Sequence, residues 1–187
     1  MRYEAFHICK PSTFIESLKA MEGTTLVEMR PTFYTATREG AQKIAKQYGS
    51  VTIIPVTLAL SRPFINAPDA SRITLDWFYE FLPGYKVLAI AGRFEHLLVN
   101  TSRWQELEAS YGTPLTLSSL YDRSLQDFLT LPLEICALAE DGAIRNMVSS
   151  MGYDGFIYGG SGDAEGEVIY YPLNTAGIRY GSEEMVS

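Results

Sequence analysis

The sequence predicts an α+β fold, with strands near both ends of the chain and a mostly helical segment between them. Apolar residues make up 47% of the 187 residues and charged residues 20%, a balance typical of a chain that buries one substantial core. Short runs rich in β-branched and aromatic residues lie near each end, and apolar residues recur at helical spacing between them. No linker or internal repeat divides the chain, so we expect a single domain over residues 1–187.

The N-terminal part is expected to alternate between strands and helices. A first strand covers residues 3–8, and a helix then begins at Thr13 and ends before Gly23. A second extended stretch, residues 31–35, precedes a short helix. The apolar face of that helix consists of Ala41, Ile44, Ala45 and Tyr48, at positions i, i+3, i+4 and i+7.

The strongest strand pattern covers residues 51–60 and contains Pro55. Because proline has no amide N–H for the ladder, we expect this strand at an edge of the sheet or at a bulge. From about residue 66 to residue 140 the periodicity is helical, which indicates a helical insertion. A glycine-rich loop then joins two further strands, at residues 156–158 and 167–171.

Several classes of function are excluded by composition and motif. The net charge is −7 and the sequence pI is about 4.9. These values argue against a protein whose whole surface binds the phosphate backbone of nucleic acids. No apolar run approaches the roughly 20 residues that span a bilayer. The two cysteines and two histidines have no metal-ligand spacing, and the glycine-rich phosphate loops of nucleotide-binding proteins are missing. We therefore expect no metal, no disulfide framework and no membrane partner.

Three residues have placements that suggest chemistry. His7 is a lone histidine in the first strand, Tyr34 precedes the short second helix, and Glu167 begins the last clear strand after the flexible loop. Each has a structural alternative: a histidine of the core, a packed tyrosine and a solvated turn residue.

The order of these motifs resembles that of the ADP-ribosyltransferase superfamily, in the branch whose motif residues are histidine, tyrosine and glutamate. The strand YEAFH, residues 3–7, is similar to the first motif, and FYTA, residues 33–36, followed by a helix, to the second. GYDGFIY, residues 152–158, followed by EVIYYP, residues 167–172, resembles the terminal hairpin with its glutamate at the strand start. The resemblance implies an ADP-ribosyltransferase-like split β-sheet core, with the helical insertion at about residues 66–140.

The resemblance also implies a reaction with NAD as co-substrate and no metal. NAD would be cleaved at its nicotinamide–ribose bond, and ADP-ribose would pass to a macromolecule. Glu167 would stabilise the positive charge that develops on the sugar. Tyr34 would stack on the nicotinamide, with Tyr48 as a second wall. His7 would bond a ribose hydroxyl, and the backbone of Ile8 would bond the nicotinamide amide.

Glu165 is a candidate for recognition of the acceptor. In a β conformation, side chains two residues apart point to the same face, so Glu165 would lie beside Glu167. Within the superfamily a glutamate at this spacing is associated with transfer to arginine, whose planar guanidinium a carboxylate can receive. The alternative is a solvated loop residue.

A mono-ADP-ribosyltransferase of this type would be a bacterial toxin, a secreted effector or a phage-encoded modifier. It would act in the cytoplasm or be delivered into a host cytoplasm. We expect a protein acceptor rather than a nucleic acid, selected by the helical insertion. Two alternatives stay open: a noncatalytic binding module with the same fold, and an NAD glycohydrolase that transfers ADP-ribose to water.

Overall fold

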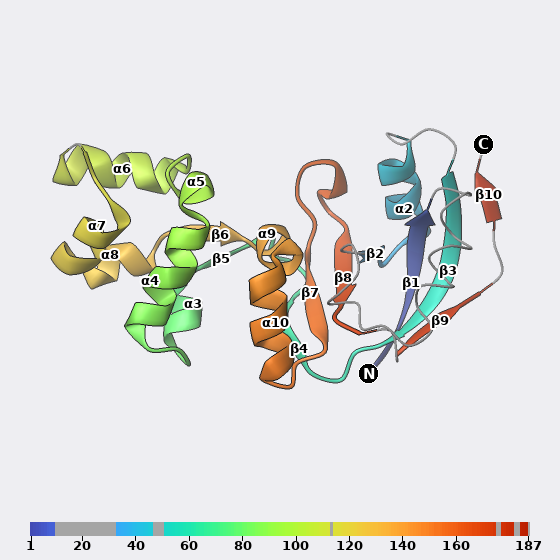
Figure 1. The fold of residues 1–187 in the computed structure, drawn as a ribbon. Coiled ribbons are helices and arrows are strands. Elements are labelled where there is room, and N and C mark those ends of the chain that lie inside the picture. Colours follow the sequence, from blue (N-terminus) through green and yellow to red (C-terminus); the bar gives the residue numbers. More distant parts are fainter. Residues whose placement is uncertain (10–32, 47–50, 113, 175–176, 182–183, 187) are drawn as a thin grey trace. The chain divides into compact units, whose positions relative to one another are not determined.

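The computed structural model describes residues 1–9, 33–46, 51–112, 114–174, 177–181 and 184–186 (Figure 1). Its mixture of helices and strands confirms the α+β class. The chain divides into two compact units: Met1–Ser71 together with Cys136–Ser187, and Arg72–Ile135. The helix predicted from Thr13 to Gly23, and Tyr48, lie outside the described residues.

The first unit is built on one mixed, eight-stranded sheet. Its strands follow the order β10-β3-β1-β2-β8-β7-β4, and β9 also pairs with β3. The strands are β1 (Arg2–Cys9), β2 (Tyr34–Thr35), β3 (Val51–Ala59), β4 (Pro63–Ala67), β7 (Gly155–Gly159), β8 (Val168–Pro172), β9 (Ile178–Tyr180) and β10 (Glu184–Val186). Only the β4–β7 pair is parallel among these described strands. Strands from both ends of the chain thus alternate within one sheet.

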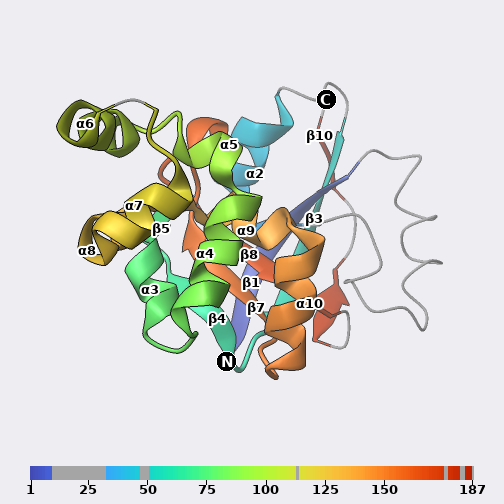
Figure 2. The ribbon, with the colours of Figure 1, turned by 60° about the vertical axis from the view of Figure 1, so that its left-hand side comes forward.

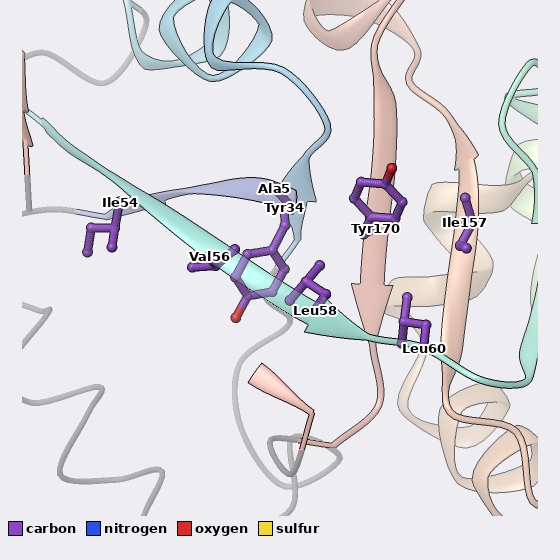
Figure 3. Close-up of a cluster of buried hydrophobic side chains, with 8 residues drawn as sticks. All are labelled: Ala5, Tyr34, Ile54, Val56, Leu58, Leu60, Ile157 and Tyr170. Atoms are coloured by element: carbon purple, nitrogen blue, oxygen red, sulfur yellow. The ribbon is translucent and has the colours of Figure 1, made fainter. Parts of the chain in front are cut away.

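Each face of this sheet has its own apolar cluster. On one face, α2 (Arg38–Ala45) packs Ala41 and Ala45 against Ile53, with Phe6 and Ile8 at the border. The cluster on the other face is drawn in Figure 3. It consists of Ala5, Tyr34, Ile54, Val56, Leu58, Leu60, Ile157 and Tyr170. The alternation of side chains along β1 and β3 divides the residues between the two clusters.

Of the two positions predicted for the proline-containing strand, the edge is wrong, and the bulge agrees with a one-residue change of register beside Pro55, between Val56 opposite Tyr180 and Ile53 opposite Glu184. β3 lies inside the sheet and pairs with β1 without a register shift, from Arg2 opposite Ala59 to Cys9 opposite Thr52. On its other side, β9 ends at Tyr180 and β10 begins at Glu184, and the Pro55 carbonyl accepts the Gly181 N–H at 2.8 Å. The amide position and carbonyl of one residue point to the same side of an antiparallel ladder. The missing donor of Pro55 therefore faces Gly181 and the change of register between β9 and β10.

The turn before β7 is fixed by a carboxylate. Asp154 accepts hydrogen bonds from the Ser61 amide at 2.6 Å, the Ser61 hydroxyl at 2.8 Å and the Arg62 amide at 3.0 Å. Gly152 just before it has a φ of 81°, a conformation that favours glycine. Two helices precede this turn, α9 (Ile135–Glu140) and α10 (Gly142–Ser150), and α10 lies alongside β4 and β7 in both ribbon views (Figures 1 and 2).

The second unit, residues 72–135, carries most of the helices of the predicted insertion. The helices are α3 (Leu75–Tyr79), α4 (Gly84–Arg93), α5 (Glu95–Leu98), α6 (Ser102–Tyr111), α7 (Leu117–Arg123) and α8 (Leu125–Leu129). Its ends form an antiparallel pair that the sequence did not predict, β5 (Arg72–Thr74) with β6 (Pro132–Glu134). Strands of three residues are too short to give a recognisable alternation. Across the described part of the whole chain, no helix has the length and apolar character needed to cross a membrane.

Candidate active site

The structure brings His7 and Tyr34 together. Phe6 pairs with Thr35 across the β1–β2 ladder, so His7 lies opposite Tyr34 and on the same face of the sheet. Their ring centroids are 5.1 Å apart. The Tyr34 and Tyr180 hydroxyl oxygens are 3.0 Å apart and share a hydrogen bond, and the His7 and Tyr180 rings meet edge-on at 6.2 Å. Tyr180 is thus a third member of this aromatic group, which sequence reasoning did not single out.

His7 and Tyr34 are buried, and Tyr180 is half-buried. Tyr34 is 0% exposed and His7 is 8% exposed. Burial lowers the pKa of His7 to about 4, although an interaction with the backbone of Phe33 acts in the opposite direction. Burial and the neighbouring Tyr180 hydroxyl raise the pKa of Tyr34 well above its usual value. Both rings are therefore neutral near pH 7, and the Nδ1 atom of His7 has no hydrogen-bond partner among the described residues.

Glu167 faces the other side of the sheet. In the β2–β8 ladder Tyr34 pairs with Tyr170, and the ladder continues as the Ala36 amide bonds the Val168 carbonyl at 2.9 Å. Side chains alternate between faces, so the next pair, Thr37 with Glu167, points away from Tyr34. The Thr37 hydroxyl donates to Oε2 of Glu167 at 2.6 Å. The structure therefore places the half-buried Glu167 carboxylate beside Thr37, apart from the His7–Tyr34 pair.

The N-terminus of α2 surrounds that carboxylate. Thr37 is the N-cap residue, and its hydroxyl accepts the Gly40 amide at 2.9 Å while donating to Glu167. A Cβ atom on Gly40 would lie 2.2 Å from Oε2 of Glu167, so glycine leaves the space that the carboxylate occupies. A negative charge at this end of a helix is stabilised by the aligned backbone dipoles. Thr37 and Gly40 were not predicted as site residues, although a threonine before a helix is a typical capping signal.

Glu165 does not share an extended segment with Glu167. Gly166 between them has a φ of 85°, and the preceding residues 162–164 form a 3-10 turn. The alternation rule for β conformation therefore does not apply, because the backbone turns at Gly166. Glu165 is exposed, and its backbone carbonyl accepts a hydrogen bond from Nζ of Lys43 at 3.0 Å.

The remaining predicted cofactor residues lie elsewhere or are not described. Ile8 packs at the border of the cluster under α2, on the same face as Glu167. Tyr48 lies outside the described residues. Among the residues that the structure describes, no group of three or more His, Cys, Asp or Glu side chains could hold a metal ion.

The arrangement therefore consists of two parts on opposite faces of three neighbouring strands. One is the buried, neutral pair of His7 and Tyr34 with Tyr180 beside it, and the other is an accessible carboxylate with a hydroxyl donor beside it. Comparisons of the chain with models of known protein families, with curated proteins and with solved structures found no match.

Proposed function

We propose that the protein is a mono-ADP-ribosyltransferase with an ADP-ribosyltransferase-like split-sheet core, which cleaves NAD at the nicotinamide–ribose bond and transfers ADP-ribose to a macromolecule. One observation carries the proposal. The three motif residues, far apart in the sequence, lie on or next to three strands that are neighbours in the sheet: His7 in β1, Tyr34 in β2 and Glu167 just before β8. The three motifs thus lie on adjacent strands, with Glu167 on the opposite face of the sheet from His7 and Tyr34.

Glu167 has the surroundings that the proposed chemistry needs. Its carboxylate is half-buried, and one oxygen is oriented by the Thr37 hydroxyl at 2.6 Å. A carboxylate held in place beforehand stabilises an oxocarbenium-like sugar without reorganising at the moment of reaction. A carboxylate can accept about four hydrogen bonds, so the Thr37 bond leaves room for a ribose hydroxyl.

The role proposed for Tyr34 requires a movement. The ring has no exposed surface, so stacking on nicotinamide requires it to leave its partner Tyr180. Breaking the hydrogen bond between the two hydroxyls costs about 1 kcal/mol. His7 would follow its ring partner Tyr34 and present its unpaired Nδ1 to a ribose hydroxyl.

The second unit is proposed to select a protein acceptor. It is a compact unit of its own, with buried apolar side chains from α3 to α8. It also exposes aromatic rings on α3, on α4 and between them: Tyr79, Phe81 and Tyr85 are 42%, 39% and 69% exposed. Aromatic residues are enriched in protein–protein interfaces, so these rings are the part of the insertion that we expect to meet the acceptor. The proposed place of action is the cytoplasm of the producing cell or of a host.

Incubation with labelled NAD and a cell lysate tests the proposal. We expect label to enter protein, and Glu167→Gln to reduce NAD cleavage by roughly 10² or more, because it removes the charge and keeps the shape. Glu165→Gln is the matched control, since Glu165 is exposed and its two described hydrogen bonds are both made by its backbone. Near-wild-type NAD cleavage by a folded Glu167→Gln protein would refute the site. Free ADP-ribose without labelled macromolecules would instead identify an NAD glycohydrolase.

A second candidate, the noncatalytic binding module, is favoured by a specific observation. Glu167 has a structural use, because it bonds the residue that caps α2. In that case wild-type protein turns over no NAD with any acceptor, and Glu167→Gln changes only the thermal stability. The same two proteins, compared by NAD turnover and by circular dichroism melting, separate the candidates.

A further inference from the structure

α2 covers only part of one face of the sheet, and the rest of that face carries exposed charged side chains. α2 packs over Phe6 and Ile8, in the second half of β1, and leaves Arg2 and Glu4 in the first half exposed. Figure 1 shows the N-terminus at the end of β1 away from α2. The start of β1 is held in place, because the terminal amine of Met1 donates to the Leu60 carbonyl at 3.0 Å.

Three strands build a pocket of about 280 Å³ on this part of the sheet. The lining residues are Arg2 and Glu4 from β1, Thr57 and Ala59 from β3, and Gly177 and Arg179 from β9 and the residue before it. Register arranges them in two rows: β3 places Ala59 beside Arg2, and Thr57 between Glu4 and Arg179. In the row with Ala59, the backbone of Gly177 lies so close to that of Ala59 that a Cβ on Gly177 would be 2.6 Å from the Ala59 carbonyl oxygen. The absence of a side chain on Gly177 deepens the pocket there.

The charges of this pocket are not neutralised. Among the described residues, neither the Arg2 nor the Arg179 guanidinium has an ion pair or a hydrogen bond. Glu4 is the acidic residue of the pocket. Its carboxylate accepts a hydrogen bond from the Thr57 hydroxyl, which lies 3.2 and 3.3 Å from the two carboxylate oxygens. Two arginines against one carboxylate leave a net positive pocket on a chain whose net charge is −7.

We propose that this pocket binds a small phosphorylated ligand, of the class of sugar phosphates. A guanidinium offers a planar fork of N–H donors that matches phosphate oxygens, and two forks suit one dianion. Glu4 keeps free lone pairs beside the Thr57 bond and would accept a hydroxyl of the same ligand. The size of the pocket suits one small molecule. A polyanion such as nucleic acid is disfavoured, because the acidic remainder of the chain would repel it.

This inference does not depend on NAD cleavage, and its test measures binding alone. Isothermal titration calorimetry of the full chain would use inorganic phosphate, ribose 5-phosphate and ribose. We expect affinity on the order of millimolar for phosphate, tighter binding of ribose 5-phosphate and none of ribose. Arg2→Ala and Arg179→Ala should each weaken ribose 5-phosphate binding about tenfold or more, and Arg2→Lys should weaken it less.

Three further variants make the result specific. Glu4→Gln should reduce the preference for ribose 5-phosphate over phosphate, because it removes the carboxylate that would accept the sugar hydroxyl, and should strengthen phosphate binding, because it removes a negative charge from the pocket. Lys86→Ala, an exposed cation of the other unit, should change neither, and Glu167→Gln should also leave both intact. Absence of phosphate binding by wild type, or equal affinities in wild type, Arg2→Ala and Arg179→Ala, would overturn the proposal. Equal losses in Lys86→Ala and Arg179→Ala would also overturn it, because they would indicate a nonspecific effect of charge.

Discussion

Alanine at position 40 should have opposite effects on stability depending on residue 167. In a helix, alanine is more favourable than glycine by about 1 kcal/mol, so Gly40→Ala taken alone should stabilise α2. In the native protein, however, the new Cβ would fall 2.2 Å from Oε2 and 2.4 Å from Cδ of Glu167. The end of the glutamate side chain must then move away from the Thr37 hydroxyl.

The expected magnitudes follow from that contact. A hydrogen bond to a charged group contributes about 1.5–3 kcal/mol, and half-exposure of Glu167 places this one at the lower end. Gly40→Ala should therefore lower the free energy of unfolding by about 1 kcal/mol in the wild-type background. With Glu167→Ala already present there is no carboxylate to displace, and Gly40→Ala should raise it by about 1 kcal/mol. The coupling energy of the cycle is then about 2 kcal/mol.

Urea unfolding of the four proteins, followed by circular dichroism, measures this cycle. Thr37→Val, which removes the hydroxyl that bonds Glu167, is a useful fifth protein: in its background the loss caused by Gly40→Ala should shrink. Equal stabilisation by Gly40→Ala in both backgrounds would show that the carboxylate does not occupy the space above Gly40. The reasoning about the α2 terminus would then fail. Under the proposed function, Gly40→Ala should also reduce NAD cleavage, because it moves Glu167.

Three further predictions concern the rest of the structure. The pKa of His7 is about 4 in the folded protein and 6.5 in the unfolded chain, so the unfolded chain binds the extra proton. The free energy of unfolding should therefore keep its full value above pH 6.5 and fall by about 3 kcal/mol as the pH drops to 4. Urea unfolding of wild type and His7→Asn measures this fall, and the same pH dependence in His7→Asn would contradict it. Tyr34→Phe should lower the free energy of unfolding by about 0.5–1.5 kcal/mol through the lost hydrogen bond to Tyr180, and Tyr34→Ala by about 3–5 kcal/mol through the cavity. Equal losses would show that the ring does not pack as described. Replacing residues 72–135 with a short Gly-Ser linker should leave a folded first unit with native-like circular dichroism. A short linker suffices because the two ends of the insertion are adjacent, with Arg72 paired with Glu134 across β5 and β6. A chain that does not fold would show that the insertion belongs to the core.

Much of the fold at the two ends of the chain could be predicted, because its signals are local. Alternating apolar residues and glycine turns indicate β1, β3, β7 and β8, and helical spacing indicates α2 and α10. The features that could not be predicted depend on partners far along the chain. Pro55 predicted an edge strand or a bulge, and the sequence near Pro55 does not decide between them. The strand is interior, and the register change beside it depends on β9 and β10, far along the chain.

The candidate site shows the same limit. The sequence places His7, Tyr34 and Glu167 in or next to strands. It does not reveal whether their side chains point to the same face of the assembled sheet. The register that pairs Tyr34 with Tyr170 decides this, and it sets Glu167 opposite Thr37 instead of beside Tyr34. A shift of one residue in that register would reverse the outcome. Order along the chain could therefore identify the neighbouring strands, while the orientation of the side chains required the structure.

The change of register opposite Pro55 also bears on the outer border of the sheet. β9 and β10 form the outer border of the sheet beside β3, and each has only three residues in a strand. A continuous border strand would present a long row of unpaired amides and carbonyls, a template on which another chain can add by intermolecular pairing. Two three-residue strands in different registers present shorter rows than one continuous strand would. Replacing this proline with valine would add a backbone donor that points toward the segment between β9 and β10.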